Sequence, residues 1–293
     1  AAVTNPNPFG LSAVGTYARP TLVDLDDDGD LDALIGNRDG NSLYFQNIGT
    51  ASSPAFAAAV TNPFGLSAVG YLASPTFADI DSDGDLDAFI GTDINDGSTV
   101  FFRNTGTASA AAFVLDTSVL DENGAPFGLS AVGYFANPTF ADIDGDGDLD
   151  AFIGTYTNDG NTVFFRNTGT ASAAAFVLDT TVLDANGAPF GLTPDGPFAS
   201  LDFGDIDGDG DLDAIVGHLY ASTAVFENTG DDHSPAFTKI GDPWGLVEVA
   251  RIANPALADL DGDGDLDAFI GNEYGDTLLF LNLAGPLRVT TAS

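Results

Sequence analysis

Five acidic nonapeptides constrain this chain more than any other feature of its sequence. They read DLDDDGDLD at 24–32, DIDSDGDLD at 79–87, DIDGDGDLD at 142–150 and again at 205–213, and DLDGDGDLD at 259–267. Carboxylates that lie a few ångströms apart repel one another and resist joint ionisation unless a cation lies between them. Each nonapeptide is therefore predicted to be a binding loop for a hard divalent metal ion.

The positions within a loop indicate which ion it binds. In the third loop the acids at positions 1, 3, 5, 7 and 9 are Asp142, Asp144, Asp146, Asp148 and Asp150. Positions 1, 3, 5 and 9 offer carboxylates, position 7 offers a backbone carbonyl, and Gly147 at position 6 permits a sharp turn. Such a flexible oxygen cage suits Ca²⁺ better than the small octahedron that Mg²⁺ demands. The DxDxDG opening is that of an EF-hand, but no Glu follows at position 12 and no amphipathic helix flanks the loop.

The same positions in all five loops define the predicted metal site, with up to five Ca²⁺ ions, one per loop. The remaining predicted ligands are Asp24, Asp26, Asp28, Asp30, Asp32, Asp79, Asp81, Asp83, Asp85, Asp87, Asp205, Asp207, Asp209, Asp211, Asp213, Asp259, Asp261, Asp263, Asp265 and Asp267. Position 8 is leucine in every loop, which predicts a side chain that fixes the loop to the core. The first loop alone has a further acid, Asp27, at position 4.

The charge and composition of the chain restrict its partners and its location. The formal net charge is −37, and 26 of the 44 acids lie in the loops, six in the first and five in each of the others. Five Ca²⁺ ions would leave about −27, a field that disfavours nucleic acid and anionic membranes. No apolar run approaches the ~18 residues needed to span a bilayer, so no membrane insertion is expected. Weak calcium loops fill at extracellular calcium levels, which predicts a secreted or cell-surface protein.

The loops belong to a repeat that occurs five times. A Phe-Gly or Trp-Gly pair precedes the first Asp of each loop by 15 residues, at Phe9, Phe64, Phe127, Phe190 and Trp244. After each loop come an apolar segment that ends in Gly, a polar turn and a second apolar segment that ends in Asn. The chain begins at Ala1 without a recognisable signal peptide, so it is expected to be a mature or excised segment.

Each repeat is predicted to form four short strands. In the third repeat we expect them at 138–143, 149–154, 162–166 and 175–178, because β-branched and aromatic residues fill short runs bounded by Gly, Asn, Asp and Pro. Helical periodicity is absent. Four strands repeated five times predict an all-β fold, a five-bladed β-propeller of four-stranded antiparallel blades.

The two ends of the chain indicate how the ring closes. The fifth repeat stops where its fourth strand should begin, and residues 1–4 (AAVT) match residues 58–61, the fourth strand of the first repeat. We therefore expect residues 1–4 to complete the fifth blade, so that 1–293 forms a single domain with repeat units that start near 9, 64, 127, 190 and 244. The rival is donation of this strand to the next molecule in a filament, but a monomer is favoured because closure within one chain loses less association entropy.

The chain resembles the FG-GAP and VCBS-type calcium-loop repeats known from integrin α-subunit propellers and many secreted bacterial proteins. The Phe-Gly pairs, DxDxDGxxD in all five loops, and the glycines at Gly36, Gly91, Gly154, Gly217 and Gly271 carry the resemblance. The resemblance implies a β-propeller with Ca²⁺ in the loop between the first two strands of each blade. The Phe-Gly pair stands further from the loop than in integrin repeats and no Ala-Pro follows it, so the bacterial branch fits better and integrin function is not transferred.

The face opposite the calcium loops is the predicted ligand face, because the turns between the second and third strands differ most between repeats. Tyrosines there suit stacking on sugar rings, and neighbouring polar side chains suit hydrogen bonding. The candidate residues are Tyr156, Asn158, Asp159, Tyr220, Asn272, Glu273 and Tyr274. The alternative interpretation is that these residues form ordinary polar hairpin turns.

The sequence predicts a non-enzymatic adhesion or ligand-binding module whose partner is a carbohydrate or a surface protein. No catalytic residues are predicted, because no arrangement of Ser, His and Asp or of paired Glu has catalytic spacing. One alternative is a structural module of an extracellular filament or surface layer. A second alternative is an accessory domain of a larger secreted hydrolase.

Overall fold

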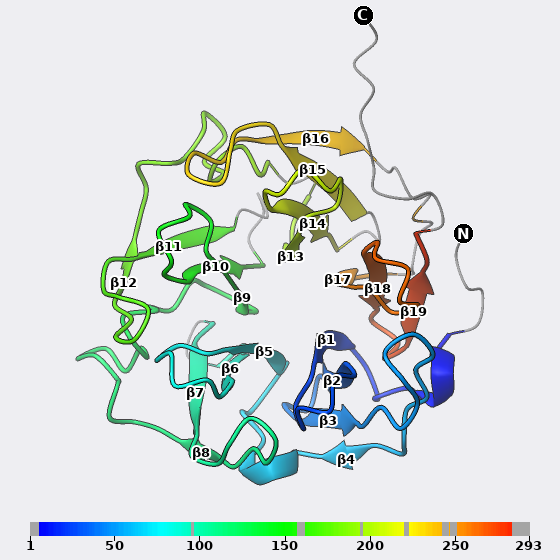
Figure 1. Cartoon of the computed structure of the whole chain (residues 1–293). Coiled ribbons are helices and arrows are strands. Elements are labelled where there is room, and N and C mark those ends of the chain that lie inside the picture. Colours follow the sequence, from blue (N-terminus) through cyan, green and yellow to red (C-terminus); the bar gives the residue numbers. More distant parts are fainter. Residues whose placement is uncertain are drawn as a thin grey trace, which may run out of the picture.

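The protein forms a ring of five antiparallel sheets around a central axis (Figure 1). The computed structural model describes residues 6–94, 97–156, 162–193, 196–219, 223–241, 246 and 251–282. These residues contain strands β1 to β19 and two 3₁₀ turns, η1 (Pro8–Gly10) and η2 (Pro63–Gly65). None of the described helices is long and apolar enough to cross a membrane.

Each sheet is one blade, and its strands follow one another in chain order. Blade 1 contains β1 (Arg19–Val23), β2 (Asp32–Gly36), β3 (Ser42–Phe45) and β4 (Val60–Thr61). Blade 2 contains β5 (Ser74–Ala78), β6 (Asp87–Gly91), β7 (Thr99–Asn104) and β8 (Phe113–Leu115). Blade 3 contains β9 (Asn137–Ala141), β10 (Asp150–Gly154), β11 (Val163–Asn167) and β12 (Phe176–Leu178). Blade 4 contains β13 (Ser200–Gly204), β14 (Asp213–Gly217), β15 (Thr223–Asn228) and β16 (Phe237–Gly241), and blade 5 contains β17 (Asn254–Ala258), β18 (Asp267–Gly271) and β19 (Thr277–Phe280).

This architecture confirms the predicted five-bladed propeller. All neighbouring strands pair antiparallel, and the first strand of each blade lies next to the axis while the last lies at the outer edge (Figure 1). The strands of blade 3 begin and end within two residues of the predicted positions. The sequence located these strands well because Gly, Asn and Asp end nearly every apolar run.

The second strand of every blade is buried along its whole length, as its continuous apolar sequence predicts. Its two faces pack against the two neighbouring blades. Among the described residues the hydrophobic core consequently has one cluster at each of the five seams between blades, and a sixth, smaller cluster contains Phe198, Leu219 and Ile252. The seam between blades 5 and 1, with Phe269, Leu279, Ile35 and Phe45, is built like the other four.

A glycine at the end of each second strand sets how closely neighbouring blades approach. A Cβ atom on Gly91 would lie 2.2 Å from the carbonyl oxygen of Ala136 in the next blade. The same relation joins Gly36 to Ala73, Gly154 to Ala199, Gly217 to Ala253 and Gly271 to Ala18. Only glycine fits at these five positions, and the last pair closes the ring.

The N-terminal segment adds to this closure through Asn7. Its N–H donates to the carbonyl of Thr277 at 2.7 Å, and its Oδ1 accepts the N–H of Thr277 at 3.0 Å. Asn62 makes the same pair of bonds to Ser42 at the end of blade 1. Asn7 is thus the equivalent of Asn62, whereas the match of residues 1–4 to 58–61 had placed Asn5 there. The predicted fourth strand at residues 1–4 lies outside the described residues.

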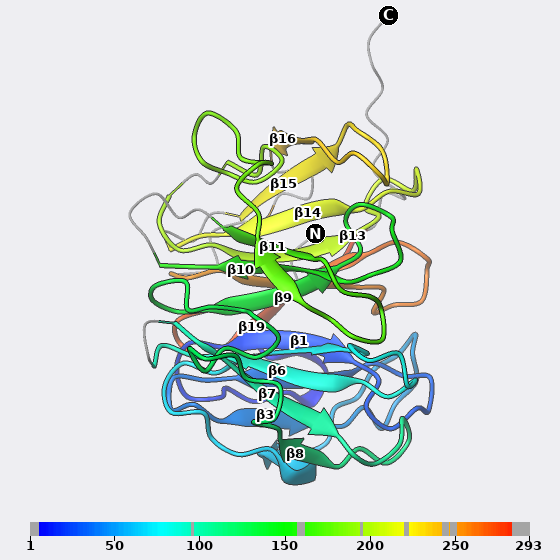
Figure 2. The same cartoon turned by 90° about the vertical axis from the view of Figure 1, so that its left-hand side faces the viewer.

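The two ends of the strands carry different loops (Figure 2). The acidic nonapeptides join the first and second strands of each blade and therefore all lie at one face. The turns between the second and third strands lie at the other face, beside the segments that lead into the same blade and into the next one. There the N–H of Tyr156 donates to Tyr134 at 2.9 Å, and that of Tyr17 donates to Glu273 at 3.0 Å. We call this second face the turn face.

Candidate metal centres and the turn face

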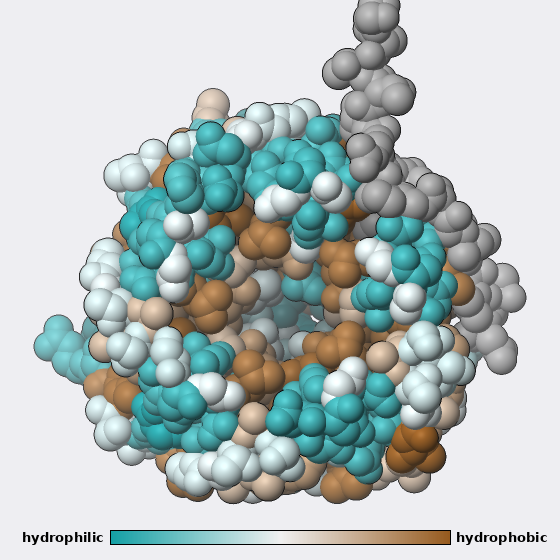
Figure 3. Space-filling model, in the orientation of Figure 1, coloured by the Kyte–Doolittle hydropathy of each residue, from teal (hydrophilic) through white to brown (hydrophobic). Residues whose placement is uncertain are grey.

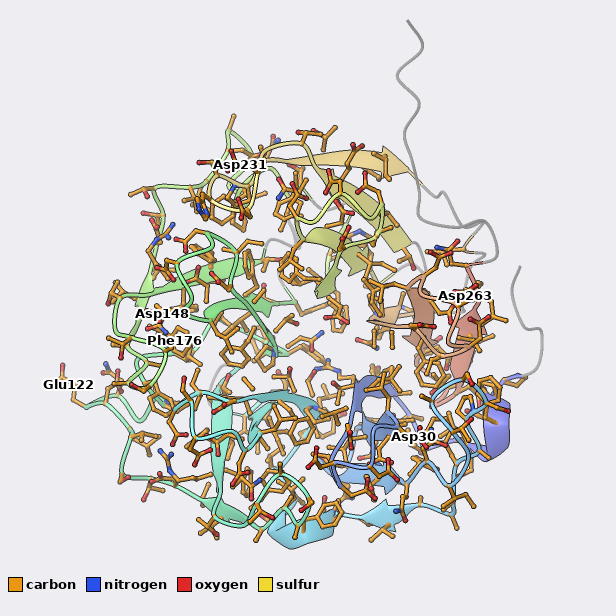
Figure 4. All side chains as sticks on the ribbon, in the orientation of Figure 1. Asp30, Glu122, Asp148, Phe176, Asp231 and Asp263 are labelled. Atoms are coloured by element: carbon orange, nitrogen blue, oxygen red, sulfur yellow. The ribbon has the colours of Figure 1, made fainter. Side chains whose placement is uncertain are left out.

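The acidic loops bring carboxylates together in all five blades. One oxygen from each acid at positions 1, 3 and 5 lies within 4.8 Å of the other two in the first, second, third and fifth loops. In the fourth loop the group is Asp205, Asp207 and Asp213, at positions 1, 3 and 9. Figure 4 places Asp30, Asp148 and Asp263, which belong to three of the loops, at separate places around the ring. Positions 1 and 3 thus converge in all five loops, position 5 joins them in four and position 9 in one, while position 7 stays outside these groups.

Backbone hydrogen bonds hold each loop in a tight turn. In the third loop Asp142 accepts the N–H of Asp146 at 3.1 Å and that of Gly147 at 3.0 Å, and Asp146 accepts the N–H of Asp148 at 2.9 Å. Gly147 has φ = 90°, which confirms the sharp turn predicted at position 6. The position 8 leucines pack against the core, as predicted from their uniformity.

Position 4 of the loop also needs a left-handed backbone, which the sequence did not predict. The residues there are Asp27 (φ 57°), Ser82 (58°), Gly145 (65°), Gly208 (79°) and Gly262 (75°). Glycine adopts this conformation without strain and other residues do so less readily. Asp27 therefore adds backbone strain as well as charge to the first loop.

The acid at position 9 is buried beneath each loop. Asp150 is 2% exposed, and its Oδ1 accepts the N–H of Asn167 at 2.6 Å. Burial raises its pKa to about 7, and the charges of Asp146 and Asp142 act in the same direction. Burial likewise raises the pKa of Asp87 and of Asp213 to about 7, and that of Asp32 and of Asp267 to about 6. A cation in the loop would favour the charged form of these acids.

Several buried carboxylate oxygens of the loops have no hydrogen-bond partner among the residues that the structure describes. They are Oδ1 of Asp26, Asp81 and Asp144 at position 3, Oδ2 of Asp87 and Asp150 at position 9, and Oδ1 of Asp211. A buried polar atom without a hydrogen-bond partner is rare in folded proteins. The free-energy cost of burying an unpaired atom is especially high for an anionic oxygen. The donor set is all oxygen and anionic, which fits a hard cation such as Ca²⁺.

In two blades an arginine on the third strand lies next to the acidic loop. Arg103 pairs with Asp81 at position 3 of the second loop and, at 3.0 Å, with Asp116. Arg166 makes the equivalent pairs with Asp144 and, at 3.0 Å, with Asp179. In the first blade the neutral Gln46 occupies this place and donates to Asp26 at 2.7 Å. The loops therefore differ in local charge through these neighbouring side chains, in addition to the extra acid Asp27 of the first loop.

A ring of large side chains surrounds the axis at the turn face. Two residues before the first strand of each blade, the backbone is left-handed at Tyr17, Leu72, Phe135, Phe198 and Ile252, with φ between 57° and 68°. Large residues rarely take this conformation, and it persists only where the surroundings enforce it. We call these five residues the mouth ring. The same left-handed backbone occurs at the equivalent position of all five blades, so it is a regular part of the fold.

A pocket of about 210 Å³ opens beside the mouth ring. It is lined by Tyr17, Phe135, Tyr156, Phe198, Leu219, Arg251, Ile252 and Glu273. The ring centroids of Phe135 and Tyr156 are 5.2 Å apart, and those of Phe135 and Phe198 are 6.0 Å apart. Arg251 Nη1 lies 3.9 Å from Glu273 Oε2. We call this the mouth pocket; it joins aromatic faces with one charged pair.

The structure brings together some of the predicted ligand residues and separates others. Tyr156 and Glu273 both line the mouth pocket, although they belong to different blades. Tyr274 is 62% exposed and does not line it, and Asn272 is buried, where its Oδ1 accepts the N–H groups of Tyr274 and Asp276 to close its own turn. Three of the predicted residues lie outside the described residues, namely Asn158, Asp159 and Tyr220.

Sequence reasoning missed the mouth ring and Arg251. The variability of the turns directed attention to the turn tips, whereas the pocket is lined mostly from the segments that enter the blades. Aligning the five repeats would have shown a large residue at every mouth-ring position. It would not have shown which of these side chains meet, since that depends on the closed ring.

Five blades with an acidic loop between the first two strands of each define a repeat propeller with one acidic loop per blade. The chain belongs to the family of FG-GAP-like repeats, whose model matches residues 24–90, 142–216 and 205–270. The matched segments include the loops of blades 1 to 5 and confirm the resemblance seen in the sequence. A search of curated proteins gave no match.

Solved structures with this fold include glycosidases. RS223-β-xylosidase is similar with a TM-score of 0.53 and 10% identity, over 94% of each chain. The GH43_1 enzyme from Xanthomonas citri complexed with xylose is similar with a TM-score of 0.51 and 9% identity, over 98% of this chain and 92% of the other. At this identity the likeness shows the fold alone. The prediction that the chain is not an enzyme is nonetheless contradicted, because these neighbours are enzymes built on the same fold.

Proposed function

We propose that the chain is an extracellular, calcium-stabilised propeller module that binds a carbohydrate in the mouth pocket. The calcium loops occupy one face and the pocket occupies the other, so that the ions support the scaffold and leave the ligand site free. The same ligand class would suit a carbohydrate-binding part of a larger secreted hydrolase.

The observation that carries the calcium proposal is the set of buried carboxylate oxygens without partners. Asp144 Oδ1 and Asp150 Oδ2 of the third loop are two such oxygens, and neither oxygen accepts an N–H or O–H group of the described residues. Asp144 also belongs to the group in which the carboxylates of positions 1, 3 and 5 converge. A Ca²⁺ ion would take oxygens from positions 1, 3, 5 and 9, and its charge would offset the repulsion within the cluster.

The kind of calcium site proposed here supports an extracellular location. Each loop is short, lies at the surface and draws its ligands from a single stretch of chain. Loop sites of this weak type fill at the millimolar calcium found outside cells.

The carbohydrate proposal is supported by the chemistry of the mouth pocket. Phe135, Tyr156 and Phe198 offer aromatic faces for the C–H surfaces of a sugar ring, and Arg251 and Glu273 offer a donor and an acceptor for its hydroxyl groups. A volume of about 210 Å³ suits one or two sugar rings better than a protein surface. The neighbour complexed with xylose uses the same fold, but at 9% identity it adds only the fold to this argument.

Removal of metal tests the calcium proposal. Chelation is expected to lower the melting temperature substantially, and added Ca²⁺ is expected to restore it, because an ion bound only by the native state stabilises that state by mass action. Elemental analysis of the purified protein gives the number of ions. An unchanged melting curve in chelator, together with no bound metal, would contradict the proposal.

A glycan array in calcium, followed by calorimetry with the best sugar, tests the ligand proposal. Tyr156→Ala is expected to weaken binding roughly two- to tenfold, because stacking on an aromatic ring contributes about 0.5–1.5 kcal/mol. Tyr274→Ala is the matched control, since that ring belongs to the turn face but lies outside the pocket. Equal loss in both variants, or an array without binding, would count against the mouth pocket.

A further inference from the structure

The first residue of each innermost strand lines a cavity on the axis of the ring. These positions hold Arg19, Ser74, Asn137, Ser200 and Asn254, all at most 8% exposed. Together with the two residues that follow in each strand, they enclose a polar space of about 40 Å³. Figure 3 shows the hollow that opens along this axis. A space of this size admits only a few particles as large as a water molecule.

The neutral residues at these positions are hydrogen-bonded to the protein. Ser74 Oγ donates to Asn137 Oδ1, and Asn137 Nδ2 donates to Ser200 Oγ. Asn254 Nδ2 donates to the carbonyl of Ala18 at 2.9 Å. Protein groups therefore occupy much of the hydrogen-bonding capacity of this layer.

Asn254 Oδ1 has no partner among the described residues, and Arg19, the one charged residue of the five, has most of its donors unpaired. Its side chain is buried, with Nη1 3.4 Å from the carbonyl of Ala136 and the guanidinium carbon 5.3 Å from the ring centroid of Phe198. Nε and Nη2 are both buried without a hydrogen-bond partner among the described residues. Three N–H groups of a guanidinium thus have no acceptor.

A buried charge without a partner strongly destabilises a fold, and a guanidinium does not escape this cost by losing its proton. Burial lowers the pKa of Arg19 to about 10, and the charge of Asp93 opposes this shift, so the group stays charged at neutral pH. Asp93 itself accepts the N–H of Phe135 at 3.2 Å. Asp202 also lines the cavity, but its two oxygens accept the N–H groups of Leu257 at 2.8 Å and Phe203 at 3.0 Å.

We propose that the axial cavity binds a small monovalent anion of halide size at the guanidinium of Arg19. The anion accepts the N–H groups of Nε and Nη2 and neutralises the buried charge. The limited volume selects against large anions, and the Phe198 ring covers the guanidinium on the side of the mouth pocket. This site is distinct from the calcium loops and from the mouth pocket, and it does not depend on either proposal.

Thermal unfolding in different anions tests the site. The calcium-loaded protein is compared in sodium chloride, sodium bromide and sodium gluconate at equal ionic strength, since gluconate is too large for the cavity. Chloride and bromide are expected to raise the unfolding midpoint by roughly 2–4 °C over gluconate once the anion exceeds its Kd about fivefold. Arg19→Asn, which copies the residue of blades 3 and 5, is expected to lose this difference. Arg251→Asn, at the rim of the mouth pocket, is the control, and this variant is expected to retain the difference in unfolding midpoint between chloride and gluconate.

A second measurement remains decisive if Arg19→Asn is unstable. Crystals of the unaltered protein grown in bromide are expected to show an anomalous peak within hydrogen-bond distance of Arg19 Nε and Nη2. The proposal is overturned if no peak lies there, or if chloride and gluconate give the same midpoint in the unaltered protein.

Discussion

The carbonyl oxygen of Ala18 lies 2.3 Å from the place that a Cβ atom on Gly271 would occupy. These residues are at opposite ends of the sequence, and their contact has the geometry of the other four seams. The ring is therefore closed by the same backbone approach that spaces its internal blades.

Substitution at this contact compares the closing seam with an internal one. Gly271→Ala is expected to lower the free energy of unfolding by about 1–3 kcal/mol, because the methyl group forces two backbones apart. Gly91→Ala, at the seam between blades 2 and 3, is expected to have the same effect. Denaturant titration measures both. A Gly271→Ala protein as stable as the parent would mean that the ring is open at this seam in solution.

Two acids of the third loop should differ in their effect on calcium binding. Asp146→Ala removes a carboxylate from the converging cluster and is expected to abolish binding at that loop. Asp148→Ala keeps the backbone carbonyl at position 7 and the N–H bond to Asp146, so its effect is expected to be less than about threefold. Calorimetric titration with Ca²⁺ counts the sites that remain. Equal damage by both changes would refute this ligand assignment.

Arg103 is expected to lower the calcium affinity of the second loop, because its guanidinium already neutralises part of the negative charge of Asp81. Arg103→Gln reproduces the residue found in blade 1 and is expected to raise the calcium affinity of that loop by roughly three- to tenfold, as one nearby cation is removed. Arg251→Gln removes the same charge from the turn face and serves as the control. If both substitutions change affinity equally, the effect is one of net charge alone.

The left-handed backbone at position 4 predicts a stabilising substitution. Asp27→Gly is expected to raise the free energy of unfolding by about 1 kcal/mol in chelator, since glycine relieves the strain at φ = 57° and removes one acid from a repelling cluster. Gly208→Asp, the reverse change in the fourth loop, should destabilise by a similar amount. Chemical denaturation of both variants without metal measures the effect.

The raised pKa values at position 9 predict opposite pH dependences with and without calcium. Asp87, Asp150 and Asp213 bind a proton more tightly in the folded chain, with pKa about 7, than in the unfolded chain at about 3.9. Their contribution to stability in chelator is therefore full below pH 4 and is lost as the pH rises through 7. Calcium must displace these protons, so the calcium-loaded protein is expected to gain stability over the same rise.

Proton release provides the direct measurement. Calcium titrations at pH 6.5, in buffers that differ in ionisation enthalpy, are expected to give different apparent heats. Heats that do not depend on the buffer would mean that the position 9 acids are already charged before the ion binds.

The sequence was sufficient to predict the blades, and the reason lies in particular residues. Gly36, Gly91 and their equivalents end each second strand, and the aspartates of each nonapeptide form one continuous loop, so local spacing is enough. Asn7 shows the limit, because the extra Asn-Pro before it shifts the apparent match of the N-terminus by two residues.

The turn face could not be predicted in the same way. Phe135 and Glu273 are far apart in the sequence and reach one pocket only because the ring closes. Arg19 stands in a strand that otherwise resembles its equivalents, and its burial on the axis depends on all five blades. Repeats reveal equivalent positions, whereas a site on the axis depends on the differences between them.

The left-handed backbone of the mouth ring affects the entropy of any binding event at this face. Phe135 and Phe198 are fixed by enforced backbone angles and by neighbouring rings before a ligand arrives. A ligand that fits them therefore immobilises few side chains, and less of its interaction energy is lost to ordering. The mouth ring is therefore a preorganised surface, and its rigid shape would determine which ligands fit.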